Sequence, residues 1–543
     1  MRATMKSLVG TGIVSGLLLG GAPGVAAQDL RLVTAAAEQD RATVRALLKQ
    51  GVDVNAARAD RATALLWAAH WNDVETADLL IRAGARVDAA DDYGVTPLAR
   101  AAENASLPMT ERLIRAGANP NLTQQSGLTP LMIAAHTGNV QVVKALLGSG
   151  ANANAATREA NSTALMWAVA DQHADIAGVL LENQADARIS TSKGFTPLMF
   201  AARNGDIPMA KRLLAAGVKV NDTGADGNHI LPYAIIAGQA DFALFLLEQG
   251  ADPTGQMEGI RPLHAAAGSA PVWLDDWNRK HGSGSLLGAG GGRGISPASR
   301  VAVMKALLDR GADPNARIAT SAMLMNYIGY PKKGAFEPFA CGTGDLRGAT
   351  PLWVAAYTAN GSVGGFGGDG GLGTGSGTDS SVELINLLLA AGGNQHLTTD
   401  DGTTPLMVAA GLGRATFSPG LQRARPSPGA EQAVKVLLDA GGNVNAVNEA
   451  DFTALHGAAF RGLNEVIQIL VDRGADINAR DFRGRTAYRI AEGAKQSFQF
   501  QAYPATAEFI KTLGANTRLG IPGTVQERLR DVPAAGANAQ QQP

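Results

Sequence analysis

Residues 127–155 read GLTPLMIAAHTGNVQVVKALLGSGANANA, and this stretch decides how the chain folds. Thr129 and Pro130 lie near its start. A threonine hydroxyl caps the free N–H groups at a helix start, and proline fits the first helical position. A leucine and paired alanines then form a narrow apolar stripe. A second apolar segment follows and stops at Gly150, where glycine can adopt the left-handed conformation that ends a helix. The stretch therefore predicts two short helices and a turn.

Both halves of this stretch return along the chain at a regular spacing. Gly51, Gly84, Gly117 and Gly150 are evenly spaced, each inside a phrase such as GVDVN or GANPN. A fixed period of this kind is the signature of a repeat architecture. In one unit Gln184 stands where the other units have this glycine, and with that unit included the chain contains twelve units. The later glycines are Gly217, Gly250, Gly311, Gly392, Gly441, Gly474 and Gly514, and the helix-start threonines include Thr96, Thr196, Thr350, Thr404 and Thr453.

The two phrases resemble the ankyrin repeat, whose T-P-L-H-x-A core and 33-residue period they match. The resemblance covers about residues 29–520, and RPLHAAA from Arg261 and TALHGAA from Thr453 keep even the histidine. It implies an all-α repeat solenoid, a stack of about twelve antiparallel helix pairs with β-hairpin or turn fingers on one side. Members of this family are binding scaffolds and rarely catalysts. The resemblance therefore implies that the chain binds another protein, uses no cofactor and has no catalytic activity of its own.

The composition excludes several other functions. The chain has 543 residues, more than one compact core usually holds, and its 47 basic and 48 acidic residues give a net charge of −1. Without an excess of charge, no overall electrostatic field attracts nucleic acid or an anionic lipid surface. Cys341 is the single cysteine, which excludes an internal disulfide and a zinc site built from several cysteines. We therefore expect a monomer with a protein partner, no nucleic acid and no membrane span.

Residues 1–27 have the pattern of an export signal. Arg2 and Lys6 give a positive start, an uncharged run follows at 8–20, and Val25 to Ala27 supplies the small residues of a cleavage site. The uncharged run is too short to span a bilayer. A buried first helix is the alternative interpretation. The sequence predicts a signal peptide at 1–27 and export of a bacterial protein to the periplasm or into the medium.

The spacing between the phrases changes in the second half of the chain. Most of the added length falls between the first and second helix of a unit, so we expect it to emerge along one edge of the stack. We expect regular repeats at 28–260, repeats with long insertions at 261–452, the last repeats and a cap at 453–520, and a disordered tail at 521–543. The expected insertions are 268–297, 316–345, 358–381 and 411–431, of which 316–345 lengthens a finger instead.

One insertion, GSVGGFGGDGGLGTGSGT at 361–378, contains ten glycines and a G-x-G-x-x-G match from Gly365 to Gly370. A dinucleotide-binding loop needs a strand before it and a helix directly after it, and the sequence indicates neither. The start of a calcium-binding nonapeptide repeat is another interpretation, but such repeats occur in stacked copies. We favour a flexible loop, because added loop length costs little free energy.

Two other insertions carry side chains that can perform chemistry, and the one at 316–345 contributes Cys341. PVWLDDWNRKHG at 271–282 contains Trp273, Trp277, two carboxylates and a histidine. These groups could perform acid–base chemistry, hold a metal or stack on a carbohydrate of the cell wall. We favour a contact patch, because tryptophan and arginine dominate binding hot spots. The alternative, an enzyme or metal-dependent module, would need Asp275, Asp276, His281 and Cys341 to converge, and the sequence does not fix that geometry.

Ankyrin repeat proteins bind through their finger tips and through the two residues that follow the paired alanines. Trp71 and Phe460 stand out here, because large apolar side chains seldom occupy solvent-facing positions without a partner. The predicted partner contacts are His70, Trp71, Glu103, Asn104, His136, Thr137, Arg203, Asn204, Tyr357, Thr358, Phe460 and Arg461 at helix ends, Tyr93, Lys193, Phe195, Phe452 and Phe482 on fingers, and Trp273 and Trp277 in an insertion.

Several other side chains have structural interpretations. Trp67, Trp167 and Phe200 each follow a threonine by four residues and are expected to pack against a neighbouring layer. The resemblance implies that His264 and His456 hydrogen-bond the neighbouring finger. The sequence predicts no catalytic, cofactor-binding or metal-binding residues.

Overall fold

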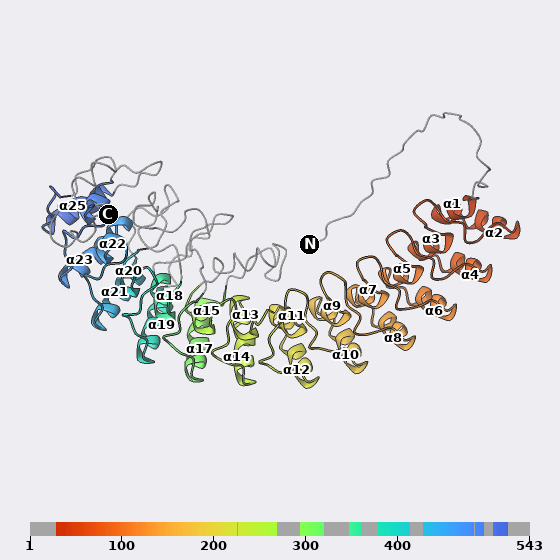
Figure 1. The fold of residues 1–543 in the computed structure, drawn as a ribbon, viewed down its shortest axis with the longest axis horizontal. Coiled ribbons are helices and arrows are strands. Elements are labelled where there is room, and N and C mark those ends of the chain that lie inside the picture. The colour runs from red at the N-terminus through yellow and green to blue at the C-terminus, as the bar shows by residue number, and fades with distance from the viewer. Residues whose placement is uncertain are drawn as a thin grey trace, which may run out of the picture. The chain divides into compact units, whose positions relative to one another are not determined.

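The computed structural model describes residues 29–224, 226–268, 294–319, 347–359, 378–412, 427–482, 484–493 and 503–519. Within these residues it contains twenty-four helices, and the only β-structure is isolated bridges. The chain divides into two compact units, Met1–Asn152 and Ala153–Pro543. In each unit short helices follow one another in pairs (Figure 1). This is the all-α repeat solenoid that the sequence predicts.

The unit of residues 1–152 contains four helix pairs. The first helix of one pair packs against the first helix of the next, so that α1, α3, α5 and α7 form one layer. The second helices α2, α4, α6 and α8 contact one another in the same order. The pairs are α1 (Arg31–Ala37) and α2 (Arg41–Lys49), α3 (Ala64–His70) and α4 (Val74–Arg82), α5 (Pro97–Glu103) and α6 (Leu107–Arg115), and α7 (Pro130–Thr137) and α8 (Val140–Gly148).

The unit of residues 153–543 contains eight further pairs among its described residues. Their first helices also pack in sequence order. The first four pairs are α9 (Ala164–Ala170) and α10 (Ala174–Glu182), α11 (Pro197–Asn204) and α12 (Ile207–Ala215), α13 (Ile230–Ile236) and α14 (Ala240–Glu248), and α15 (Pro262–Ala267) and α17 (Pro297–Leu308). The last four are α18 (Pro351–Thr358) and α19 (Thr378–Ala390), α20 (Pro405–Ala409) and α21 (Pro428–Asp439), α22 (Ala454–Arg461) and α23 (Asn464–Asp472), and α24 (Ala487–Glu492) and α25 (Pro504–Thr512).

Many of the helices begin directly after a residue whose side chain caps them. The Thr96 hydroxyl accepts the N–H of Ala99 at 3.2 Å, and Pro97 occupies the first position of the helix. Where a side chain caps a second helix, it belongs to an aspartate, asparagine or serine rather than to a threonine. Asp73, for example, accepts the N–H of Thr76 at the start of α4. Each cap satisfies an N–H group that has no partner within the helix, and such caps typically stabilise a helix by about 1 kcal/mol.

Small residues let the first helices approach one another closely. The paired alanines Ala68 and Ala69 on α3, and Ala101 and Ala102 on α5, are completely buried. Leu98, directly after the Thr-Pro start of α5, is also completely buried. Full burial of one such leucine contributes roughly 2 kcal/mol, so the core is a sum of similar contributions repeated from pair to pair.

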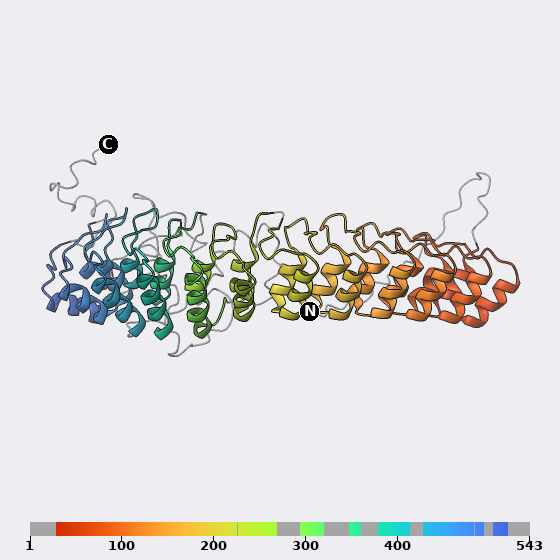
Figure 2. The ribbon, with the colours of Figure 1, turned by 90° about the horizontal axis from the view of Figure 1, so that it is seen from below.

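The fingers between the pairs are turns, with short bridges such as Ala57 to Thr63 and Ala156 to Thr163. In each unit they project on the same side of the helices (Figure 2). Main-chain hydrogen bonds connect successive fingers, for example from the N–H of Gln125 to the carbonyl of Tyr93 at 2.9 Å. The expected fingers are therefore present in their turn form.

Asparagine side chains connect the turns that follow successive second helices. Asn121 donates from Nδ2 to the carbonyl of Gly150 at 2.9 Å, and its Oδ1 accepts the N–H of Asn152 at 2.8 Å. One carboxamide thus satisfies one acceptor and one donor of the next turn. We call this series of contacts the turn ladder. It is made by Asn55, Asn121, Asn154, Asn221, Asn315 and Asn445.

The insertions expected from the sequence fall largely outside the described residues. The described helices that flank them are α15 and α17, α18 and α19, and α20 and α21. Residues 320–346, which include most of the long finger, lie between α17 and α18 in the sequence. The signal peptide, the insertions and the tail therefore stay predictions.

Candidate protein-binding surface

The first helices of residues 1–152 carry a row of partly exposed side chains. Trp67, Arg100 and Ile133 each follow a capping threonine by four residues and are half-buried. Because α3 packs on α5 and α5 on α7, these side chains occupy equivalent positions on neighbouring helices. Trp67 and Ile133 pack against buried core residues, so the row lies at the boundary between core and surface.

An aromatic cluster lies on α3 at one end of this row. The rings of Trp67 and Trp71 are stacked with centroids 6.5 Å apart, and the His70 ring meets Trp71 edge-on at 4.7 Å. The Arg58 guanidinium lies 5.2 Å from the centre of the Trp67 ring. Trp71 is 44% exposed, yet its indole N–H donates to the carbonyl of Ala37 at 2.9 Å. The exposed ring is thus held in one orientation, which reduces the entropy lost when a partner binds it.

Polar groups surround the aromatic cluster. Arg100 and Glu103 form an ion pair at 2.7 Å on α5. Burial, together with the nearby Arg100 charge, lowers the pKa of His70, so the imidazole is neutral at physiological pH. Asn104 donates to the carbonyls of Ala69 and His70, both at 2.9 Å. The cluster therefore has an apolar centre and a polar margin, which is the usual composition of a protein interface.

Two more predicted contacts in this unit are exposed. Tyr93 lies on the finger before α5 with 71% of its surface exposed. His136 is exposed near the end of α7. These residues belong to the same layer of first helices and fingers as Trp71.

The unit of residues 153–543 has a similar row on α9 and α11. Trp167 and Phe200 are half-buried at the positions that correspond to Trp67. The Arg203 guanidinium lies 5.3 Å from the centre of the Phe200 ring, and Lys193 is exposed on the preceding finger. The structure therefore repeats the pairing of an arginine with an aromatic ring in both units.

Further along this unit, the predicted contacts are less exposed. Tyr357 is half-buried and stacks on Trp353 with ring centroids 5.5 Å apart and planes inclined by 6°. Phe460 is half-buried on α22, and Phe482 lies 6.3 Å from the buried Phe452 ring. Only part of each side chain is available to a partner.

Three expectations of surface exposure are wrong. Phe195 is 6% exposed, because its ring packs between those of Phe200 and Tyr233, each 6.2 Å away. Phe452 is 1% exposed. Arg461 is 8% exposed, because its stem lies against Gly411 of the preceding helix pair, where an added Cβ would come within 2.8 Å of Arg461 Cγ. These side chains support the fold and are not available as surface contacts.

One structural role at the helix ends is not anticipated by the sequence interpretation. The side chain eight residues after the capping threonine reaches back to the end of the preceding first helix. Asn204 donates to the carbonyl of Ala170 at 3.1 Å, and Thr137 donates to that of Ala102 at 3.2 Å. The sequence does contain a signal for this role, because a side chain that can donate a hydrogen bond recurs eight residues after the capping threonine. Trp71, Asn104, Thr137, Asn204 and Thr358 all make this contact.

The two buried histidines have the structural role that the resemblance implies. His264 Nε2 lies 3.0 Å from the carbonyl of Ala316 and 3.1 Å from that of Ala349, and Nδ1 accepts the N–H of Arg261. Nε2 must carry the proton, because both carbonyls accept. Burial lowers the pKa of His264 to about 4, so this neutral form persists at physiological pH. His456 contacts the carbonyl of Arg485 at 3.2 Å in the same way.

The described residues contain no group of three His, Cys, Asp or Glu side chains placed to hold a metal ion. No helix within the described ranges is long and apolar enough to cross a membrane. The residues named for the alternative functions, Trp273, Asp275, Asp276, Trp277, His281 and Cys341, lie outside the described residues.

The helix pairs, capping threonines and turn ladder define a repeat solenoid of the ankyrin class. The family model described as ankyrin repeats (3 copies) matches residues 32–124, 98–191, 180–257 and 377–481, which together make up more than half of the chain. The chain therefore belongs to the ankyrin repeat family. This identifies it as a protein–protein interaction scaffold of a kind that is typically non-catalytic.

Curated relatives share only the repeats. Ankyrin repeat and SOCS box protein 16 of Homo sapiens is 33% identical over 141 residues, 26% of this chain and 28% of that protein. E3 ubiquitin-protein ligase KEG of Arabidopsis thaliana is 34% identical over 115 residues, 21% of this chain and 6% of that protein. The neurogenic locus Notch protein of Drosophila melanogaster is 34% identical over 150 residues, 26% of this chain and 5% of that protein. The matches span less than a third of each relative.

Proposed function

We propose that this chain is an exported, monomeric ankyrin scaffold that binds another protein through the face of its first helices and fingers, without catalysis of its own. The observation that carries the proposal is the Trp71 side chain, which is both exposed and oriented by its hydrogen bond to Ala37. Oriented aromatic side chains of this kind dominate the energy of protein interfaces.

The surface around Trp71 is suited to a protein segment. It combines the stacked indoles of Trp67 and Trp71 with the neutral His70 and the ion-paired Arg100 and Glu103. Arg100 and Glu103 are paired with each other, and the Arg58 guanidinium lies against the Trp67 ring, so a partner would not have to neutralise an isolated carboxylate. Apolar contact would supply most of the affinity and the polar margin the orientation.

Crosslinking capture from the exported fraction tests this surface. We expect the wild-type chain to recover a specific protein and Trp71→Ala to recover at least about tenfold less, since a hot-spot aromatic contributes roughly 2 kcal/mol. Val447→Ala is the matched control, because Val447 is also an exposed apolar residue (55%) but belongs to a turn of the other unit and is not among the predicted partner contacts. Equal recovery by wild type and Trp71→Ala would contradict the proposal that the partner binds the surface around Trp71.

A second variant separates this surface from the insertions. Deletion of 269–293 and 360–377, the parts of these two insertions that lie outside the described helices, leaves Trp71 and its neighbours in place. We expect this variant to recover the same protein as the wild type. If recovery requires the insertions, recognition lies there, around Trp273 and Trp277, and the first-helix surface is not the binding site.

The proposed export rests on the pattern of residues 1–27. In a bacterial host, we expect the chain to leave the cytoplasm and to begin at Gln28 after cleavage. Amino-terminal sequencing of the exported fraction measures this directly. An uncleaved chain retained in the cytoplasm would contradict the proposal.

A further inference from the structure

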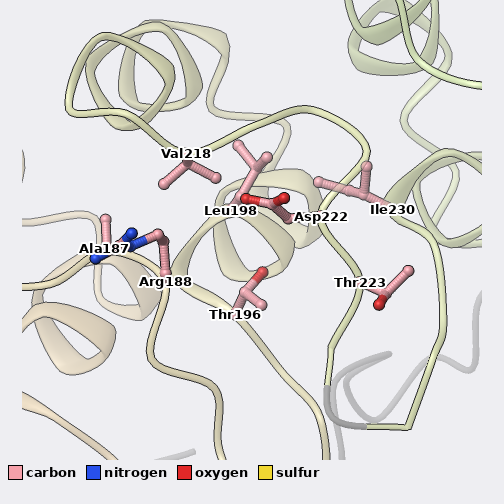
Figure 3. Close-up of a pocket in the computed structure, with 8 residues that line it drawn as sticks. All are labelled: Ala187, Arg188, Thr196, Leu198, Val218, Asp222, Thr223 and Ile230. Carbon is pink, nitrogen blue, oxygen red and sulfur yellow. The ribbon is translucent and has the colours of Figure 1, made fainter.

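A pocket of about 350 Å³ lies between two neighbouring turns of residues 153–543. One turn, 184–188, follows α10, and the next, 217–222, follows α12. In Figure 3, Ala187 and Arg188 lie on one side, Thr223 and Ile230 lie opposite, and the Asp222 carboxylate lies between them beside Leu198. The lining residues are Ala187, Arg188, Thr196, Leu198, Val218, Asp222, Thr223 and Ile230.

The pocket lies where the turn ladder is interrupted. Arg188 occupies the position that asparagine holds in the ladder, and its guanidinium bonds within its own turn to Asp186, at 3.0 and 3.3 Å. In the next turn the N–H of Lys219 donates to Asp222 at 3.0 Å rather than to an asparagine of the preceding turn. Within the described residues, no side chain of 184–188 hydrogen-bonds to 217–221. The space that a carboxamide fills elsewhere is therefore open here.

Other contacts hold the two helix pairs together around the pocket. Asn204 donates to the carbonyl of Val169 at 3.1 Å, and Arg212 donates to that of Ala174 at 3.1 Å. At the fingers, a Cβ added to Gly224 would meet the Gly194 carbonyl oxygen at 1.8 Å, so the two main chains are in close contact. The two helix pairs and their fingers are therefore held together by other contacts, and among the described residues only the side-chain hydrogen bonds between the two turns are missing.

Intact parts of the ladder show which chemical group fits this position. Asn221 donates to the carbonyl of Gly250 at 3.1 Å and accepts the N–H of Asp252 at 2.8 Å. Asn154 makes the same pair of bonds to Gln184 and Asp186. A primary carboxamide does this because it carries an acceptor oxygen and a donor nitrogen on one carbon.

The charges of the pocket favour the same group. Arg188 can only donate hydrogen bonds and Asp222 can only accept them. The hydrogen bond and the charge of Asp186, with a smaller contribution from the charge of Asp222, raise the pKa of Arg188, so the guanidinium stays charged. Asp222 would repel a carboxylate and Arg188 would repel an ammonium group, whereas a neutral amide satisfies both. Leu198, Val218 and Ile230 offer an apolar floor for a short aliphatic stem.

We propose that this pocket binds an amide group of a partner, supplied by an asparagine or glutamine side chain or by the main chain, in the position that asparagine occupies in the intact turn ladder. The partner is the protein assumed under the proposed function, so this inference rests on that proposal. The binding chemistry of the pocket is tested separately with small amides. A failure to bind amides therefore leaves the proposed function standing, and a failure to capture a partner leaves the amide pocket standing.

Methyl NMR of the full chain tests the pocket, because Leu198, Val218 and Ile230 carry reporter methyl groups. The probes are propionamide, N-methylacetamide, propionate and propylammonium, which are similar in size. We expect saturable shifts of these three residues with propionamide, and affinities roughly fivefold lower or worse for the two ions, as loss of one hydrogen bond predicts. If N-methylacetamide matches propionamide, the main chain is the source. Shifts that are absent, or equal for all four probes, overturn the proposal.

Two variants complete the test. Arg188→Asn places the chain's own carboxamide in the gap, so we expect a higher unfolding midpoint and no response to propionamide. Arg188→Ala empties the position without filling it, and we expect a response that is retained but weakened roughly fivefold. An Arg188→Asn chain that responds like the wild type overturns the proposal. If Arg188→Asn does not fold, the proposal is overturned by an Arg188→Ala chain whose affinity for propionamide is unchanged.

Discussion

The indole N–H of Trp71 hydrogen-bonds to the main-chain carbonyl of Ala37 at 2.9 Å, and thereby joins the end of α3 to the last residue of α1. The same ring is 44% exposed. One side chain thus connects two repeats and offers an apolar surface to a partner. From its position in the sequence alone, we would expect Trp71→Ala to leave thermal unfolding nearly unchanged. The hydrogen bond changes that expectation.

Trp71→Ala should lower the free energy of unfolding by about 1–2 kcal/mol, since the indole hydrogen bond and part of the ring's packing are lost. Trp71→Phe keeps most of the apolar ring and loses the hydrogen bond, so its effect should be smaller. Urea denaturation of the three chains measures the difference. An unchanged midpoint for Trp71→Ala would show that the contact with Ala37 contributes nothing.

Asn121→Ala should be more destabilising than its exposed position suggests. Its carboxamide makes two hydrogen bonds to the next turn, at 2.9 and 2.8 Å, and each contributes about 1 kcal/mol. Asn443→Ala is the control, because the Asn443 side chain accepts an N–H within its own turn, from Asn445. We expect Asn121→Ala to cost about twice as much in unfolding free energy, measured with urea. Equal losses would show that the contact between turns adds no stability of its own.

Stability should fall as the pH is lowered from about 6.5 to about 4. The pKa of His264 is about 4 in the folded chain, against 6.5 as the ordinary value, because burial disfavours the charged imidazole. Between these values the unfolded chain binds the extra proton, so folding loses free energy, up to the order of 3 kcal/mol. The stability is complete above pH 6.5. Nearby Arg261 lowers this pKa further and Asp313 raises it.

His264→Gln tests this linkage. The variant should be less stable at pH 7, since glutamine cannot reproduce the hydrogen bonds made by both nitrogens of the imidazole. Its unfolding free energy should depend less steeply on pH between 4 and 6.5. Urea midpoints across that range give both slopes. An unchanged slope would assign the acid sensitivity to other groups, of which His456 is one, because burial also lowers its pKa.

The ion pair of Asp481 and Arg485 is buried, with side chains 0% and 7% exposed and an N–O distance of 2.6 Å. Asp481→Asn should cost about 3 kcal/mol or more, because it leaves the guanidinium charge buried without its carboxylate. The exposed pair of Asp439 and Arg473 is the control, with side chains 65% and 44% exposed. Asp439→Asn should change the unfolding free energy by less than about 0.5 kcal/mol. Thermal unfolding of both variants distinguishes the two cases.

The sequence predicts the helix pairs well because their signals are local. Thr96 and Pro97 fix a helix start within one turn, and the regular period of the repeat supplies that information many times. The direction of a finger side chain is not local. The repeat position of Phe195 predicts a surface side chain, but its ring packs with Phe200 and Tyr233, which lie on two different helices. Periodicity cannot decide which way such a ring turns.

The candidate surface shows the same limit. The exposure of Trp71 and Tyr93 follows from their positions in the repeat. The burial of Arg461 does not, because it depends on the space left by Gly411 in the preceding pair. The pocket at Arg188 depends on a substitution in one turn of the ladder, and its meaning appears only when that turn is compared with its neighbours in space.

The contacts of the turn ladder depend on which turns are neighbours in space and not on how far apart they are in the sequence. Asn121 and Gly150 are 29 residues apart, and Asn315 and Gly392 are 77 residues apart, yet both pairs form the same hydrogen bond at 2.9 Å. The scaffold can therefore accommodate chain segments of very different length between its fixed contacts. For protein engineering, the junction after α18, which lies inside the longer of these two spans, is a natural place to graft a foreign peptide for display.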